Sequence, residues 1–146
     1  MTRPELSTIV VAWRAADDVA ELVSEWPDDR RFELVLVDQE GDLAVRLESV
    51  EASRAQPRSS GNIRLLVPGR NLGFGGGSNF GAQAAGADLL FFLNPDARPA
   101  ADALAALCAG FATWPQAAGL VPRLVGFDGA PQADWQLRRL PTPLAL

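Results

Sequence analysis

Continuous apolar stretches alternate along the chain with segments that have a helical pattern of apolar residues. The stretches are rich in β-branched residues, as is typical of strands buried on both faces of a sheet. Four of them are predicted to be strands: Ser7–Trp13, Phe32–Asp38, Ile63–Val67 and Asp88–Asn94. A fifth strand is expected in "GLVPRLV", residues 119–125.

The segments between these strands favour helices. After the first strand, Val19, Leu22, Val23 and Trp26 fall at i, i+3, i+4 and i+7, which places them on one face of a helix, and Asp18 is a candidate N-cap. We expect three further helices, over residues 43–54, from Ser78 to about residue 87, and over residues 100–111.

This alternation predicts an α/β fold, a three-layer α/β/α sandwich with a mainly parallel sheet. Residues 1–146 are expected to form a single domain with its core at about 7–125 and an irregular segment at 126–146. In such sheets ligands bind at the carboxyl ends of the strands. Asp38, the glycine-rich stretch 70–81 and Asp96 each follow a predicted strand, so they are expected along one edge.

Composition restricts the chemistry available at that edge. The chain has no His, Tyr or Lys, and all 13 basic residues are Arg. Histidine bases, Schiff-base lysines and the usual nucleophilic triads are therefore excluded within this chain. A metal site built from carboxylates, carbonyls and hydroxyls favours Mg²⁺ or Mn²⁺ over zinc.

Charge and apolar length indicate where the protein acts. The net charge is −5 and there is no basic run, which disfavours nucleic acid as a partner. No apolar run reaches the length of a membrane span, and the N-terminus has no secretory signal. Cys108 is the single cysteine, which fits a reducing compartment. We therefore expect a cytoplasmic protein without a transmembrane segment.

The stretch "RNLGFGGGSNFG", Arg70–Gly81, fails both common phosphate-binding motifs. A P-loop needs Gly-Lys-Ser/Thr, and the dinucleotide motif G-x-G-x-x-G finds Ser78 where its third glycine belongs. Two interpretations stay open. The glycines form a structural turn, or the amides of Gly75–Ser78 point toward an anion such as a sugar diphosphate.

Two other polar positions also have alternative interpretations. In "LNPDA", Asp96 is either a helix cap or a metal-binding carboxylate, with Asn94 on the other side of the intervening proline. Asp38 is either a turn residue or an acceptor for the base or ribose of a nucleotide. The residue pattern alone does not decide between these alternatives.

The order of these segments resembles family 2 glycosyltransferases. "STIVVAW", "LVLVDQEGD", "NLGFGGGSNFG" and "LNPDARP" occur at nearly the family's spacing, and the resemblance extends from about Ser7 to Thr142. It is strongest to the bacterial rhamnosyltransferase-like enzymes of polysaccharide biosynthesis. The resemblance implies a GT-A fold and inverting transfer of a sugar from a nucleoside-diphosphate donor to a glycan or lipid-linked acceptor.

The same resemblance assigns the site residues. Asp96 matches the last Asp of the family's metal-binding motif and would hold Mg²⁺ or Mn²⁺ on the diphosphate. The residues that would bind the donor nucleotide are Asp38, Arg70, Asn71, Gly76, Asn79 and Asn94.

Some features depart from the family pattern. Trp13-Arg14 stands where an aromatic-Asn pair is usual, and nothing after Asp96 matches the acidic motif of the general base. We therefore expect a truncated GT-A domain, the donor-binding half, whose catalytic base is unknown. The alternative is a non-catalytic module that forms a homodimer or binds a partner through its apolar end, "PTPLAL". A peripheral location at the inner membrane face and an NAD-binding Rossmann protein are further hypotheses.

Overall fold

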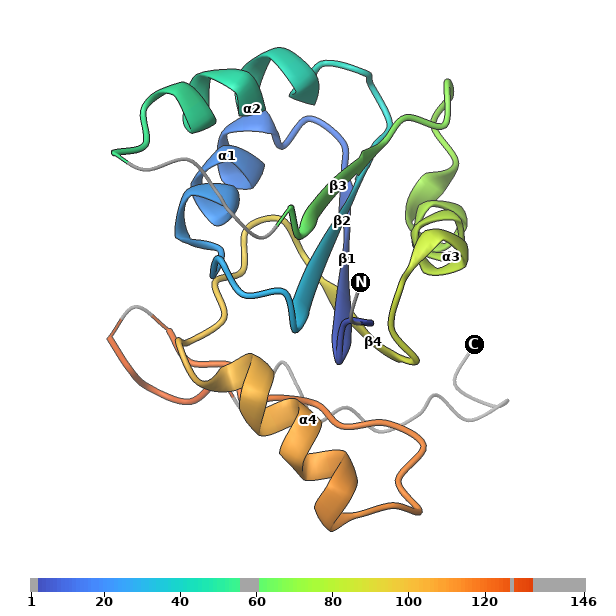
Figure 1. The fold of residues 1–146 in the computed structure, drawn as a ribbon, viewed down its shortest axis with the longest axis vertical. Coiled ribbons are helices and arrows are strands. Elements are labelled where there is room, and N and C mark those ends of the chain that lie inside the picture. The colour runs from blue at the N-terminus through green and yellow to red at the C-terminus, as the bar shows by residue number, and fades with distance from the viewer. Residues whose placement is uncertain (1–2, 56–60, 127, 133–146) are drawn as a thin grey trace, which may run out of the picture. The chain divides into compact units, whose positions relative to one another are not determined.

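The computed structural model describes residues 3–55, 61–126 and 128–132, which contain four strands and four helices (Figure 1). In chain order these are β1 (Leu6–Ala12), α1 (Ala16–Glu25), β2 (Phe32–Asp38), α2 (Leu43–Ala52), β3 (Ile63–Leu66), α3 (Gly73–Ala84), β4 (Leu89–Leu93) and α4 (Ala103–Thr113). The chain divides into two compact units, Met1–Leu104 and Ala105–Leu146, and the sheet belongs to the first. None of the helices in the described ranges has the length and apolar character needed to cross a bilayer.

The four strands form one parallel sheet in the order β3-β2-β1-β4. Ala12 at the end of β1 pairs with Asp38 at the end of β2, and Val10 pairs with Leu93 of β4. This register brings the carboxyl ends of the strands to one edge. The predicted parallel sheet is confirmed.

Helices cover both faces of this sheet within the first unit. Figure 1 shows α1 and α2 on one side and α3 on the other. Side chains alternate between the faces along each strand. On the α3 side, buried residues of β1 and β2 form a cluster against which Leu66 and Phe80 pack; its members are Ile9, Val11, Val35 and Val37. The predicted three-layer arrangement is therefore present.

The glycine-rich stretch is a helix along most of its length, which corrects the expectation of a loop up to Ser78. Helix α3 begins at Gly73, so Ser78 lies buried inside the helix and does not cap it. A Cβ atom added at Gly77 would lie 2.7 Å from Val11 Cγ1. Low helix propensity predicted a loop, but glycines on the buried face let the helix approach the sheet closely, and tertiary packing decides the outcome.

Two other local predictions are wrong. Residues 119–125 form no strand and only Val125 makes an isolated bridge, with Pro131; Pro122 has no N–H to donate to a sheet. The N-cap of α1 is Ala15, and Asp18 lies in the first turn without a capping role. Most of the segment predicted to be irregular, 126–146, including "PTPLAL", lies outside the described residues.

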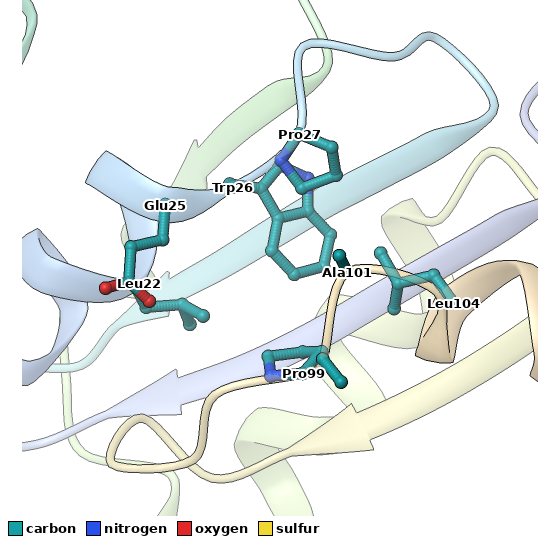
Figure 2. Close-up of a pocket in the computed structure, with 8 residues that line it drawn as sticks. Leu22, Glu25, Trp26, Pro27, Pro99, Ala101 and Leu104 are labelled. Carbon is teal, nitrogen blue, oxygen red and sulfur yellow. The ribbon is translucent and has the colours of Figure 1, made fainter.

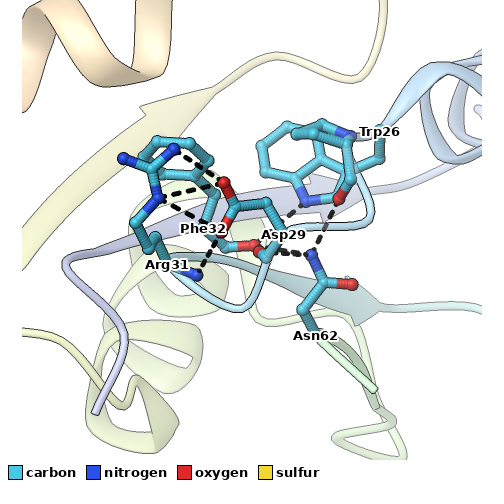
Figure 3. A network of polar contacts seen from close by, with 6 residues as sticks. Trp26, Asp29, Arg31, Phe32 and Asn62 are labelled. Atoms are coloured by element: carbon cyan, nitrogen blue, oxygen red, sulfur yellow. Dashed lines mark hydrogen bonds and ion pairs between the residues drawn. The ribbon is translucent and has the colours of Figure 1, made fainter. Parts of the chain in front are cut away.

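Asn62 holds together the connection between α1 and β2 (Figure 3). Its Nδ2 lies 2.9 Å from Pro27 O, 3.0 Å from Asp29 O and 2.9 Å from Phe32 O. Within the same connection, Arg31 Nη2 forms an ion pair with Asp29 Oδ2 at 2.7 Å. The contacts of Asn62 join the connection and the start of β2 to the residue directly before β3.

A buried carboxylate ties the start of β2 to the turn before β4. Glu33 accepts hydrogen bonds from Ser7 Oγ at 2.5 Å and Gly86 N at 2.7 Å, and Arg64 Nη1 lies 3.2 Å from its other oxygen. Burial acts to raise the pKa of Glu33, but these hydrogen bonds and the Arg64 charge outweigh it and hold that pKa below its usual value. Glu33 is therefore ionised in the folded protein at neutral pH.

Candidate functional site

The sheet has a topological switch point between β1 and β4. The chain passes from β1 to β2 and β3 on one side, and then returns to place β4 on the other side of β1. In open α/β sheets, ligands bind outside the carboxyl ends of the strands at this point. Trp13 and Arg14 follow β1 there, and Asn94, Pro95 and Asp96 follow β4.

The segment after β4 presents a carboxylate at this switch point. The Ala97 N–H donates to Asn94 O at 3.1 Å, which closes a tight turn with Pro95 and Asp96 at its centre. Asn94 and Asp96 are both exposed. Within the described ranges, the Asp96 carboxylate makes no hydrogen bond or ion pair. Its oxygens are therefore available to a ligand.

This donor set fits a divalent cation that is shared with a substrate. Among the described residues, no three His, Cys, Asp or Glu side chains come close enough to form a metal cluster. Mg²⁺ often binds through one or two carboxylates and completes its octahedron with water and substrate phosphates. The exposed Asp96 carboxylate and Asn94 amide match that mode, and a fully protein-built cage is absent from the part of the chain described.

Asp38 is almost completely buried, and its carboxylate is engaged by the backbone. Oδ1 accepts from the amides of Glu40 at 3.1 Å and Gly41 at 2.8 Å, and Oδ2 accepts from Leu43 N at 2.9 Å. Asp38 therefore holds the turn between β2 and α2 and satisfies the first amide of that helix. Its contact with a nucleotide base stays a prediction.

Gln39 links the end of β2 to the start of α3. Its Oε1 accepts from Leu72 N at 2.6 Å, and Asn71 Oδ1 accepts from Gly73 N at 2.7 Å. These two bonds fix the chain as it enters the helix, beside the carboxyl ends of the strands. Sequence reasoning missed Gln39, because a glutamine after a strand gives no local signal of a partner 33 positions away.

The start of α3 brings several predicted donor-binding residues to this region of the fold. Arg70 and Asn71 lie just before the helix, Gly76 lies in its first turn and Asn79 in its second, and all four are exposed. The first amides of a helix carry partial positive charge. Arg70 adds a full positive charge that is without an ion pair among the described residues. The helix amides and the Arg70 guanidinium both favour an anionic ligand.

Arg14 lies at the switch point in an unusual backbone conformation. Its φ is 54°, in the left-handed region that L-residues rarely adopt, and Glu40 Oε2 accepts its N–H at 2.5 Å. The guanidinium lies 4.9 Å from the centre of the Trp13 ring, and Trp13 as a residue is 53% exposed. An aromatic surface and a cation thus stand together at the end of β1.

An apolar cavity of about 160 Å³ lies apart from these groups. It is bordered by the C-terminal end of α1 and the segment after β4, and Figure 2 shows Trp26, Pro99 and Leu104 at its wall. None of the predicted site residues lines it. The cavity is therefore not part of the candidate site.

Comparison with known proteins identifies the family. Residues 7–144 match Glycosyl transferase family 2. A structure of S. aureus TarS, residues 1–349, superposes with a TM-score of 0.56 at 22% identity, over 75% of this chain and 32% of that one. A search of curated proteins found no match. The TarS likeness supports the fold alone. Together with the parallel sheet and the family match, it fits the GT-A type. The chain belongs to glycosyltransferase family 2.

Proposed function

We propose that this chain binds a nucleoside-diphosphate sugar at the carboxyl edge of its sheet, as the donor site of a glycosyl transfer. The observation that carries the proposal is the unpaired Asp96 carboxylate in the turn after β4. This carboxylate stands at the switch point of the sheet. The chain belongs to a family that is named for glycosyl transfer. The start of α3 follows β3, which lies at the other edge of the sheet from β4, and it offers polar and cationic groups.

The diphosphate and the base of the nucleotide would be bound by different groups of the protein. Donors for the diphosphate come from the guanidinium of Arg70 and from amides in the first turn of α3 other than that of Gly73, which already donates to Asn71. Asn71, Gly76 and Asn79 lie along the same helix start, where a ligand approaches the backbone without a long side chain in between. Asp38 shapes the neighbouring turn through its backbone bonds, and its base contact is part of the proposal.

Asp96 and Asn94 would hold Mg²⁺ or Mn²⁺ next to the diphosphate. A bound divalent cation supplies charge neutralisation for a diphosphate leaving group. The protein's own contribution is to keep the Asp96 carboxylate exposed and unpaired at the end of β4. Because the chain contains no Lys, only arginines and backbone amides are available to share that task.

Transfer of the sugar needs an acceptor and a general base. The acceptor implied by the resemblance is a glycan or a lipid-linked saccharide, with inversion at the sugar and rhamnose as one candidate donor. The chain spans 32% of the TarS chain it resembles, and no described residue is assigned as the base. For this chain we therefore propose donor binding, in a cytoplasmic protein peripheral to the inner membrane face.

Calorimetry with UDP, dTDP and GDP, each with and without MnCl₂, tests the proposal. We expect one of these nucleotides to bind, with an affinity that rises at least tenfold with Mn²⁺. Nucleotide binding with the same affinity with and without Mn²⁺ would favour the alternative hypothesis of a non-catalytic module. Absence of binding by all three would contradict the proposal.

A further inference from the structure

Arg98 connects the turn after β4 to helix α1. Its Nη1 donates to the carbonyl oxygens of Pro95 at 2.8 Å and Ala97 at 3.1 Å. Its Nη2 donates to Asp18 O at 3.0 Å and to Glu21 Oε2 at 2.7 Å. One guanidinium therefore joins the turn to a helix about 77 to 80 positions earlier in the sequence.

The guanidinium is held firmly in this place. The Arg98 side chain is 23% exposed, which makes it less exposed than its partner Glu21, and its Nε lies 3.9 Å from Glu25 Oε2. The planar guanidinium directs its donors along fixed directions, so it can serve both sets of acceptors at once. A lysine in its place would have one nitrogen and could not span the turn and the helix in the same way.

The two carbonyls that Arg98 binds in the turn belong to Pro95 and Ala97, the residues directly before and after Asp96. The Asp96 side chain has no hydrogen bond of its own within the described ranges, so its position depends on the backbone that carries it. Arg98 fixes that backbone on both sides. It acts on Asp96 through the main chain and leaves the carboxylate oxygens free.

We propose that Arg98 is the positioning residue that fixes the Asp96 carboxylate for a divalent cation at the donor diphosphate. This inference rests on the proposed function. The ion pair between Arg98 and Glu21 then contributes to the affinity for the metal as well as to the stability of the fold. Glu21, with Glu25 further away, is in turn a group on α1 that holds the guanidinium by charge.

The test compares Arg98→Ala and Arg98→Lys with Arg46→Ala. Arg46 is a matched control because it also forms an ion pair with α1, through Asp17, but it comes from α2 and does not contact the turn. Three quantities are measured for each protein. They are hydrogen exchange of the Ala97 amide by NMR, the affinity for MnCl₂ in the presence of the nucleotide that the unmodified chain binds, and the affinity for that nucleotide without metal.

We expect Arg98→Ala to speed exchange of the Ala97 amide and to weaken Mn²⁺ binding at least tenfold, with metal-free nucleotide affinity within twofold. Arg98→Lys should fall between Arg98→Ala and the unmodified chain, and Arg46→Ala should match the latter. Unchanged Mn²⁺ affinity in Arg98→Ala, or an equal loss in Arg46→Ala, would overturn the inference while the proposed function stands. An unmodified chain that binds no nucleotide would instead overturn the proposed function, whatever the exchange rates show.

Discussion

Gly81 and Ile9 are in such close contact that a Cβ atom at residue 81 would lie 2.6 Å from Ile9 Cγ2. The same atom would lie 3.0 Å from Val37 Cγ2, so both β1 and β2 border it. Real Cβ atoms do not approach other atoms that closely. The absence of a side chain at residue 81 therefore sets the distance between α3 and the sheet, and with it the place where α3 begins beside the strand ends.

Gly81→Ala should destabilise the protein by about 1–3 kcal/mol, because the added methyl group overpacks a filled core. Gly75→Ala is the matched control: it lies in the same helix, and a Cβ there meets nothing within 4 Å. That substitution should stabilise the protein by about 0.5–1 kcal/mol through the higher helix propensity of Ala. Urea unfolding of both variants measures the difference. Equal effects of the two substitutions would contradict the packing described for α3.

Glu33 makes the stability of the protein depend on pH in the acidic range. Its pKa is held below the usual 4.5 in the folded protein, so the unfolded chain binds the proton more readily. The stabilisation is therefore fully present above about pH 4.5 and is lost as the pH falls through the lower folded pKa. Thermal unfolding of the unmodified chain between pH 6 and pH 3 should show this loss.

Glu33→Gln removes the ionisable group while keeping the side chain's size. We expect a cost of about 1–3 kcal/mol at pH 7, because the hydrogen bonds and the Arg64 contact lose their charged partner. The melting temperature should then change less between pH 6 and pH 3 than in the unmodified chain. Asp29→Asn is the comparison, since hydrogen bonds from Arg31 also lower the pKa of Asp29, but on a carboxyl that is more exposed than that of Glu33. A pH profile that Glu33→Gln leaves unaltered would refute the assignment.

Asp38→Ala should destabilise the protein by about 1–3 kcal/mol, because three backbone amides lose their acceptor. Asp38→Asn keeps one acceptor oxygen and should cost less. If Asp38 also contacts the nucleotide, Asp38→Asn should weaken nucleotide binding by more than its effect on stability explains. Chemical denaturation and calorimetry on the same samples separate the two roles. A fully stable Asp38→Ala protein would show that the turn does not need this carboxylate.

The strands were predictable because their signal is local. Continuous apolar runs such as Phe32–Asp38 fix both the element and its ends, and the observed β2 has those same bounds. The start of α3 was not predictable in this way, since glycine disfavours helices and only the contact of Gly77 and Gly81 with the sheet compensates. The expected fifth strand failed for the opposite reason: its apolar run has no partner strand in the described residues, and Pro122 interrupts it.

The residues of the candidate site also differ in whether their signal in the sequence is local. Asp96 was recognised because its motif and its place after a strand are both local features. Gln39 and Arg98 were not, because Leu72 lies 33 positions from Gln39 and Glu21 lies 77 positions from Arg98, and both contacts depend on the topology of the sheet. The backbone bonds of Asp38 are local, within five residues, and they agree with the turn role that was one of its two predicted interpretations.

Metal-dependent nucleotide binding by Asp96→Ala tests the central claim most directly. Asp102→Ala removes the same charge from another exposed aspartate of the same compact unit and serves as the control. Titration of MnCl₂ into each protein with the bound nucleotide gives the affinities. We predict that Asp96→Ala loses the Mn²⁺-dependent part of binding and that Asp102→Ala retains it. Equal Mn²⁺ affinity in Asp96→Ala and the unmodified chain would contradict the account.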